Sequence, residues 1–396
     1  MSSTKPFAGV TVLDFSRVLA GPFCTAMLAD MGASIIKVEP PSGDDQRAMG
    51  AFKNGISVSF ELTNRNKRSI RLDLKSEEGL EIARQLAARC DVVVENFRPG
   101  VADKLGIGYA DLKRRREDLI YCSISGFGQS GPLASFPSYD VIAQALSGLM
   151  SITGTPAGEP MIVGDSVGDT VSGIFAAWAI ASALYRRATT GEGANLDVAM
   201  FDSLFALLPT ALAQLQVSNE APVRHGNQHP LSAPFGAYTA ADGSLIIAIA
   251  NNALFARFAA TIGKPGLSSD ERFATDRLRR SNRDELRAEI EAWTGSLAAA
   301  DAARILGDAG IPASVIWDVA EAANSPQAQH RALLTTVEHD VVGSLRLPEQ
   351  PVHITGLARG EVCPAPKLGE HGAEILRDLL GKDEGEIARL QDAGVI

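Results

Sequence analysis

The first 125 residues alternate short apolar runs with segments of helical periodicity, and this alternation restricts the possible folds more than any other feature. The runs predict strands at 10–15, 33–39, 69–74, 91–95 and 119–124, and the segments between them predict helices at 22–31, 76–88 and 110–116. Because the strands are apolar on both faces, they are expected to form a parallel sheet covered by helices on both sides. The pattern therefore predicts an α/β fold with a Rossmann-like large domain.

The rest of the chain indicates a second domain. After a long helix at 170–187, a strand at 196–199 and a helix at 201–215, residues 217–234 are polar and resemble a linker or an active-site loop. Strand and helix patterns then restart at Phe235, and the tail has a strand at 345–347 and a helix at 370–380. We predict a large domain of 1–215 with 335–396, a smaller α/β domain of 225–330, and linkers at 216–224 and 331–334.

Charge and composition narrow the class of partner. The formal net charge of −10 argues against nucleic acid, which needs a basic face, but allows a small anionic ligand. The most apolar helical stretch, 171–184, is shorter than the roughly 20 residues of a membrane span, so no membrane association is expected. Four dispersed cysteines and a polar N-terminal segment predict a cytoplasmic protein with reduced thiols.

Two motifs suggest alternative activities. Glu39 ends the second strand as in dinucleotide-binding folds, but the loop 16–22 lacks the spaced glycines of such sites, so Glu39 is better interpreted as a strand-end acid or a salt-bridge partner. The segment 164–168 matches the G-x-S-x-G motif of serine hydrolases with Ser166 as nucleophile. Its preceding strand, 161–163, is very short, and no His-Gly-Gly loop comes before it. The hydrolase remains the weaker alternative.

Asp169, directly after this motif, has two possible roles. At the start of the long helix it can act as an N-cap, accepting hydrogen bonds from free N–H groups of the first turn. The positive end of a helix also favours an ionised carboxylate, and such a group can attack a thioester carbonyl. The residues by themselves leave both roles open.

Eight segments in order resemble the class III CoA-transferase family, which includes formyl-CoA transferase and carnitine CoA-transferase. They are the segments 9–23, 28–40, 66–70, 93–100, 126–132, 139–145, 164–173 and 190–193, and the ending 366–371 is similar to the family's C-terminal signature. This resemblance implies transfer of coenzyme A between carboxylic acids, with acyl-CoA as substrate and no permanently bound cofactor or metal. It also implies a homodimer whose chains pass through one another like linked rings.

The resemblance assigns roles residue by residue. Asp169, four residues before Gly173, matches the nucleophile. The matching CoA contacts are Val18, Ala20, Leu72, Lys75, Asn96, Phe97, Arg98, Lys104 and Tyr139. A cationic patch for the CoA phosphates is expected from Lys67, Arg68, Lys75, Arg98 and Lys104.

Departures from the family bear on the substrate. Leu19 replaces a glutamine of formyl-CoA transferases and their glycine run is not found, which argues against formate and oxalate. The 2-methylacyl-CoA racemases of the same fold place a catalytic histidine where this chain has Tyr139, a phenol of pKa ~10 and a poor base. CoA transfer is therefore favoured over racemisation, and a racemase is a stronger alternative than the hydrolase.

Candidate substrate contacts come from two polar loops. The segment 224–230 contains Arg224, His225 and His229. Arg47 lies in the loop after the strand expected at 33–39, and Asp140 follows Tyr139 in the segment 139–145. Cations and amides suit a second carboxylate, so a small dicarboxylic acid such as succinate, with its CoA thioester as donor, is the predicted substrate.

Overall fold

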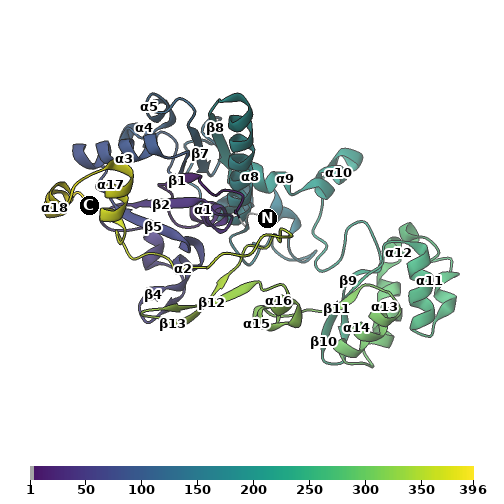
Figure 1. Cartoon of the computed structure of the whole chain (residues 1–396). Coiled ribbons are helices and arrows are strands. Elements are labelled where there is room, and N and C mark those ends of the chain that lie inside the picture. The colour runs from purple at the N-terminus through teal and green to yellow at the C-terminus, as the bar shows by residue number, and fades with distance from the viewer. Residues whose placement is uncertain (1–3) are drawn as a thin grey trace. The chain divides into compact units, whose positions relative to one another are not determined.

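The computed structural model describes residues 4–396, which form two compact units (Figure 1). Unit 1 contains residues 4–150, 162–219 and 326–396, and unit 2 contains 151–161 and 220–325. The short segment 151–161, which the sequence pattern left in the large domain, thus packs with the smaller unit.

Unit 1 is built on a six-stranded, fully parallel sheet. Its strands, in spatial order, are β5 (Lys67–Arg71), β2 (Ser34–Glu39), β1 (Thr11–Asp14), β6 (Val92–Glu95), β7 (Ile120–Ser125) and β8 (Ala194–Ala199). This is the Rossmann order, in which the chain winds one way from β1 and then the other way from β6. The predicted parallel sheet is confirmed, with strand ends moved by up to three residues.

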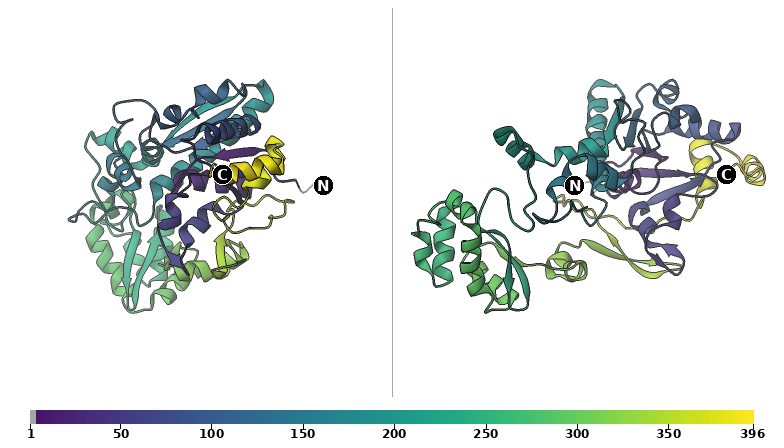
Figure 2. Two further views of the ribbon diagram at one scale, coloured as in Figure 1. Left: turned by 90° about the vertical axis from the view of Figure 1, so that its left-hand side faces the viewer. Right: turned by 180° about the vertical axis from the view of Figure 1, so that it is seen from behind.

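Helices cover both faces of the sheet, because alternate strand residues point to opposite sides. Leu13, Ile36 and Val93 pack into one core, and Val12, Ile35 and Val92 into the other. The first core is closed by α3 (Glu77–Arg89), α4 (Val101–Leu105), α5 (Tyr109–Lys113), α17 (Gly372–Leu380) and α18 (Glu384–Asp392), and the second by α1 (Ala20–Asp30) and α8 (Val167–Thr190). Figures 1 and 2 show the C-terminal helices beside the first strands, far from them in sequence.

The remaining elements of unit 1 surround this sandwich. They are η1 (Asp45–Ala48), β3 (Phe52–Lys53), β4 (Ile56–Ser57), α2 (Val58–Asn64), α6 (Asp140–Leu146), α9 (Met200–Ala206), α10 (Pro209–Ser218), α16 (Pro326–His330), β12 (Leu334–His339) and β13 (Gly343–Pro348). The β12–β13 hairpin and α2 share a small core of their own. The short helix α7 (Leu149–Ile152) lies at the chain boundary between the units.

Unit 2 has a three-stranded antiparallel sheet of order β11-β10-β9 and its own apolar core. Its elements are β9 (Phe235–Ala240), β10 (Gly243–Ala248), β11 (Ala313–Val315), α11 (Asn252–Thr261), η2 (Pro265–Ser268), α12 (Asp276–Ser281), α13 (Arg283–Thr294), α14 (Ala299–Asp308) and α15 (Val319–Asn324). Arg279 is fully buried there, donating to the carbonyl oxygens of Ala233 and Phe273.

Two helix predictions were wrong in detail. The helix expected at 201–215 is broken into α9 and α10, bent by 68°, because Pro209 lacks an N–H group and disfavours helical backbone in the residue before it. The helix expected at 170–187 begins at Val167 and has 24 residues, so its length and composition would allow a membrane span. It packs along α1 and against β7 and β8, and we interpret it as a core helix of the fold.

Candidate active site

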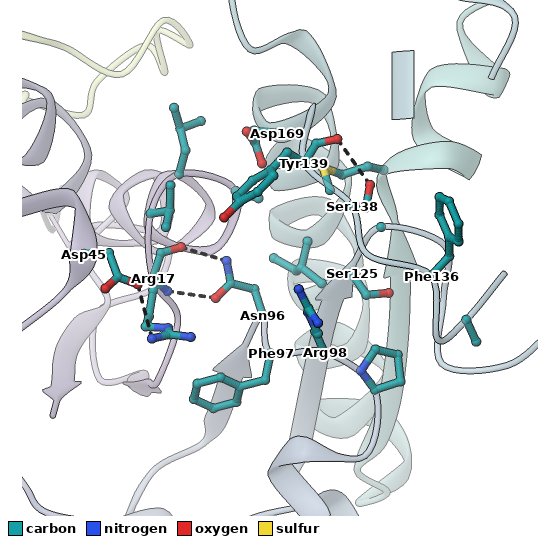
Figure 3. Close-up of a pocket in the computed structure, with 18 residues that line it drawn as sticks. Arg17, Asp45, Asn96, Phe97, Arg98, Ser125, Phe136, Ser138, Tyr139 and Asp169 are labelled. Atoms are coloured by element: carbon teal, nitrogen blue, oxygen red, sulfur yellow. Dashed lines mark hydrogen bonds and ion pairs between the residues drawn. The ribbon is translucent and has the colours of Figure 1, made fainter. Parts of the chain in front are cut away.

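A cavity lies at the carboxyl edge of the sheet, where β1 and β6 are neighbours and the winding reverses. Ligands of open α/β sheets bind at this switch point because the two connections diverge and leave a crevice. The cavity has a volume of about 260 Å³. Its lining (Figure 3) comprises Arg17, Val18, Leu19, Ala20, Asp45, Asn96, Phe97, Arg98, Pro99, Ile124, Ser125, Gly126, Ala134, Phe136, Ser138, Tyr139, Asp169 and Met200. We call it the Asp169 cavity.

A second cavity of about 520 Å³ adjoins the same edge and shares Arg17 and Phe97 with the first. Its other walls are Phe15, Val38, Pro40, Pro41, Ser42, Leu72, Asp73, Leu74, Lys75, Val101 and Leu105. Together the two cavities form a run of pockets along the carboxyl ends of β5, β2, β1 and β6. We call the second one the Leu72 cavity.

Asp169 is the third residue of α8, and Ser166 occupies the N-cap position. Of the two roles left open for Asp169, the N-cap is therefore wrong. Two glycines allow close packing around it: an added Cβ would lie 2.9 Å from Asp140 Oδ1 at Gly168 and 2.8 Å from the Ala20 carbonyl oxygen at Gly173. The start of α8 is thus held tightly between α6 and α1.

The half-buried Asp169 carboxylate accepts no hydrogen bond from any described residue within 4–396. Burial, followed by the charge of Asp140, raises its pKa from the ordinary value to about 7. The helix terminus was expected to keep this group ionised, but burial and the charge of Asp140 act in the opposite direction. A carboxylate with few stabilising contacts is a comparatively reactive nucleophile once ionised.

Asp140, at the start of α6, is buried, and its hydrogen-bond partners among residues 4–396 are amide groups. Its Oδ1 accepts from the Gly168 N–H at 2.6 Å and its Oδ2 from Gln144 Nε2 at 2.6 Å. Gln144 Oε1 in turn accepts from the Val163 N–H at 2.9 Å. Asp140 is not among the described residues that line the Asp169 cavity, although a substrate contact was expected of it.

The loop after β1 forms the wall opposite Asp169, and its backbone is fixed at several points. Asn96 Oδ1 accepts from the Arg17 N–H at 2.8 Å, and Asn96 Nδ2 donates to the Arg17 carbonyl at 2.7 Å. The Val18 N–H donates to Asp44 Oδ1 at 3.0 Å. Val18 has φ of +65°, a strained conformation for a β-branched residue. The loop is therefore held in a shape that its own sequence disfavours.

Buried ion pairs on and beside the neighbouring strands hold this loop in place. Lys37 Nζ donates to Asp44 Oδ2 at 2.7 Å and to the Ser16 carbonyl at 3.0 Å. Lys67 Nζ donates to Asp14 Oδ2 at 3.1 Å, and burial lowers its pKa to about 8. Burial would raise the pKa of Asp14, but the two lysines outweigh this and hold it below its usual value.

The structure brings most of the expected CoA contacts together, divided between the two cavities. Val18, Ala20, Asn96, Phe97, Arg98 and Tyr139 line the Asp169 cavity, and Leu72, Lys75 and Phe97 line the Leu72 cavity. In the view of Figure 3 the Tyr139 ring lies between Asp169 and the contact of Arg17 with Asn96. Lys104 lines neither cavity, but its helix α4 contributes Val101 and Leu105 to the second.

Several expected cations have other partners. Lys67 is buried against Asp14, and Arg68, the next residue at the amino end of β5, pairs with Glu374 at 2.8 Å, so neither belongs to the cationic patch at the cavities. Arg47 donates to both oxygens of Glu39 at 2.7 Å and to the Pro366 carbonyl, a disposition that favours a structural role. Glu39 is thus a salt-bridge partner, one of its two expected roles.

The remaining substrate candidates belong to unit 2. Arg224 donates to the carbonyl oxygens of Thr155, Ser151 and Gly158, which occupies its guanidinium group. His229 stacks on Phe235 with ring centroids 4.6 Å apart. Burial, together with Arg283 and His229, lowers the pKa of His225. The contacts of Arg224 and His229 are thus with other residues of unit 2.

The serine-hydrolase alternative lacks its structural context. No strand precedes Ser166 in the described segment 153–166, and Ser166 is simply the residue before a helix. A nucleophile elbow needs a strand entering a sharp turn. The match at 164–168 is therefore not an elbow.

Sequence reasoning missed Arg17, which lines both cavities and pairs with Asp45 at 3.2 Å. It also missed Ser125, Phe136 and Ser138 in the Asp169 cavity. A usable signal existed for Arg17, because it follows β1 directly and the carboxyl ends of parallel strands face the crevice. No comparable signal marks Phe136 and Ser138, which come from the long loop before α6.

Comparisons with known proteins show the family and the fold. A family model described as "CoA-transferase family III" matches residues 7–372. The chain is 43% identical to acetyl-CoA:oxalate CoA-transferase of Acetobacter aceti, over 94% of this chain and 95% of the relative. It is 38% identical to succinyl-CoA:glutarate CoA-transferase of Mus musculus, over 100% and 91%. A crystal structure of a CAIB/BAIF family protein from Brucella suis is similar with a TM-score of 0.84 and 38% identity, covering 95% of this chain and 100% of the other.

Proposed function

The chain belongs to CoA-transferase family III and is a CoA-transferase (EC 2.8.3), and we propose that it moves coenzyme A from an acyl-CoA thioester to a free carboxylic acid through covalent intermediates on Asp169. The observation that carries the proposal is the carboxylate of Asp169, half-buried and without a hydrogen-bond donor among residues 4–396, in the cavity at the switch point of the sheet. Most of the expected CoA contacts line that cavity or the adjoining one.

The proposed chemistry has four balanced steps. The ionised Asp169 attacks the acyl-CoA carbonyl, forming a mixed anhydride and releasing CoA thiolate. The thiolate attacks the aspartyl carbonyl, forming aspartyl-CoA and releasing the donor acid. The acceptor carboxylate attacks this thioester, giving a new anhydride and thiolate. Finally the thiolate attacks the acceptor's carbonyl, which yields the new acyl-CoA and regenerates the Asp169 carboxylate.

Each tetrahedral intermediate carries an oxyanion, which needs hydrogen-bond donors placed in advance. We assign this role to the backbone N–H groups of Leu19 and Ala20, which line the Asp169 cavity at the start of α1. The neighbouring N–H groups of Arg17 and Val18 are already donated to Asn96 and Asp44.

The CoA part of the acyl-CoA substrate is proposed to run along the two cavities. The apolar wall around Leu72 and Leu74 suits the adenine ring, and the cations Lys75 and Arg17 suit the phosphates. The pantetheine arm then passes Phe97 into the Asp169 cavity. In this proposed arrangement the thioester sulfur lies beside the Asp169 carboxylate.

Asp169→Ala should abolish transfer while CoA still binds, and Asp165→Ala, an exposed carboxylate earlier in the same segment, is the matched control. Hydroxylamine should trap the aspartyl thioester only in proteins that keep Asp169. Ser166→Ala should keep its activity. Appreciable transfer by Asp169→Ala would remove this residue from its role.

For the substrate we propose a small dicarboxylic acid. Two relatives are named for dicarboxylates, oxalate and glutarate, and one of them also for succinyl-CoA as donor. Because one of these relatives is named for oxalate, Leu19 and the missing glycine run no longer argue against oxalate. A panel of acetyl-CoA and succinyl-CoA donors against mono- and dicarboxylic acids, read by mass spectrometry of the new thioester, tests this. Monocarboxylates reacting faster than every dicarboxylate would contradict the proposal.

The racemase alternative requires a base for the α-proton. No histidine is among the described residues lining either cavity, and Tyr139, at the matching position, is 74% exposed. Incubation of a 2-methylacyl-CoA in deuterated water distinguishes the two activities. Deuterium at the α-carbon without transfer to any acid would favour the racemase.

We also propose the linked-ring homodimer and a cytoplasmic location. Large apolar side chains on α8 and α9 are exposed in a single chain: Trp178 is 66% exposed, Tyr185 75% and Phe205 44%. Faces of this kind commonly pack against another chain. A monomeric mass in sedimentation at micromolar concentration would contradict the dimer.

A further inference from the structure

Asp140 is buried and close to Asp169, and the described residues give it no cationic partner. Both of its oxygens accept from uncharged amides, the Gly168 N–H and Gln144 Nε2, each at 2.6 Å. A buried carboxylate normally has a cationic partner, because removing a charge from water is costly. Among residues 4–396 none lies within salt-bridge distance of Asp140. The negative charge of Asp140 is therefore not neutralised by a neighbouring cation.

The closest ionisable neighbour on which it acts is Asp169. Gly168, whose N–H bonds to Asp140, directly precedes Asp169 in α8, and any side chain at Gly168 would collide with Asp140 Oδ1. The pKa of Asp169 is raised first by burial and then by the charge of Asp140. Because Asp140 lines neither cavity, it does not touch the substrate there.

Other charges around Asp169 lie on the elements packed against α8 or in the cavity wall. They are Asp202 on α9, Asp197 on β8, Asp30 on α1, and Arg17, Asp45 and Arg98 in the cavity wall. Asp30 is paired with Arg65 and Arg17 with Asp45. Asp140 is the one described charge that acts on the pKa of Asp169.

We propose that Asp140 is a positioning residue that fixes the first turn of α8 and, through its uncompensated charge, makes ionised Asp169 a stronger nucleophile. The reason is that acylation converts the Asp169 carboxylate into a neutral anhydride and then a neutral thioester. Repulsion between the two carboxylates is present before the attack and absent after it. The inference rests on the proposed function, since it assigns Asp169 as the nucleophile.

Asp140→Asn tests the charge while keeping an oxygen that accepts from the Gly168 N–H. Asp169 should then ionise at lower pH. At pH 6 a carboxyl with a pKa of about 7 is ionised in about one molecule in ten, and a fall of about one unit would raise that fraction roughly fivefold. Above pH 8, where Asp169 is ionised in both proteins, kcat should fall and KM should stay unchanged.

Two variants separate charge from structure. Gln144→Leu breaks the bonds to Asp140 and Val163 but leaves the Asp140 charge, so it should lower stability without moving the acid limb of the rate profile. Asp202→Asn removes a charge from the first turn of α9, which also packs on α8, and should leave the limb in place. If Asp140→Asn does not fold, combining it with Gln144→Leu removes the donor that would face the introduced side-chain amide, and comparison with Gln144→Leu alone then isolates the charge.

The titration of Asp169 is read directly, by ¹³C NMR of carboxyl-labelled aspartate with Asp169→Asn identifying the signal. A fall in its midpoint in Asp140→Asn, together with the shifted acid limb, supports the proposal. An unchanged midpoint, or an equal shift in Gln144→Leu, overturns it. If the midpoint falls but the native protein transfers no CoA, the charge effect stands and the proposed function fails.

Discussion

Replacing Lys37 by methionine is expected to destabilise unit 1 by about 3–5 kcal/mol, the usual cost of leaving one member of a buried ion pair without its partner. Lys37 is 0% exposed and Asp44 is 2% exposed. The change removes the 2.7 Å contact to Asp44 Oδ2 and the donor to the Ser16 carbonyl. The N–H groups of Gln46 and Val18 would still bond to Asp44 Oδ1, but no cation would oppose its charge.

The loss should depend on pH in a defined direction. In the native protein burial would raise the pKa of Asp44, but Lys37 outweighs it and holds the pKa below its usual value. Asp44 therefore contributes stability above its unfolded pKa, which is lost as pH falls through the lower folded pKa. Without Lys37, burial dominates and the folded pKa rises. The variant is then relatively stable below the unfolded pKa of about 4 and loses stability as pH rises through the raised folded pKa.

Urea unfolding followed by circular dichroism at several pH values measures this effect. Lys37→Met with Asp44→Asn should recover most of the loss, because the introduced amide oxygen can still accept from the N–H groups of Gln46 and Val18. Lys53→Met, an exposed lysine, is the control and should change little. A loss that is equal at all pH values, or no recovery in the double variant, would refute the electrostatic argument.

Two further predictions concern α8. Transfer by the native protein should decline as pH falls through about 7, approaching tenfold per unit, because the protonated form of Asp169 is not a nucleophile; a flat kcat profile between pH 5 and pH 8 would contradict this. Gly173→Ala should cost about 1–3 kcal/mol, since its Cβ would lie 2.8 Å from the Ala20 carbonyl and 3.1 Å from Phe23 Cδ1. Ser182→Ala, on the exposed side of the same helix, is its control in thermal unfolding.

The sequence predicted some of the candidate site residues correctly and others wrongly. Family motifs pointed to Asp169 and to a set of CoA contacts, most of which line the two cavities. Arg47 and Lys67 looked equally suitable as cations, yet the fold pairs them with Glu39 and Asp14. Residue type gave the available charges, but only the three-dimensional packing decided which of them were already neutralised.

The sequence by itself determined the parallel sheet and its order of elements, because strands apolar on both faces must be covered by helices on both sides. It also placed the helix predicted at 76–88 within one residue of α3, since signals for helix starts, such as the Ser76 N-cap, are local. Only the tertiary structure decided the state of Asp169. Its pKa depends on burial and on the charge of Asp140, a residue 29 positions earlier that the fold holds nearby by a bond from the Gly168 N–H. Desolvation and charge act through space, and the order of residues in a chain does not record which of them fold together.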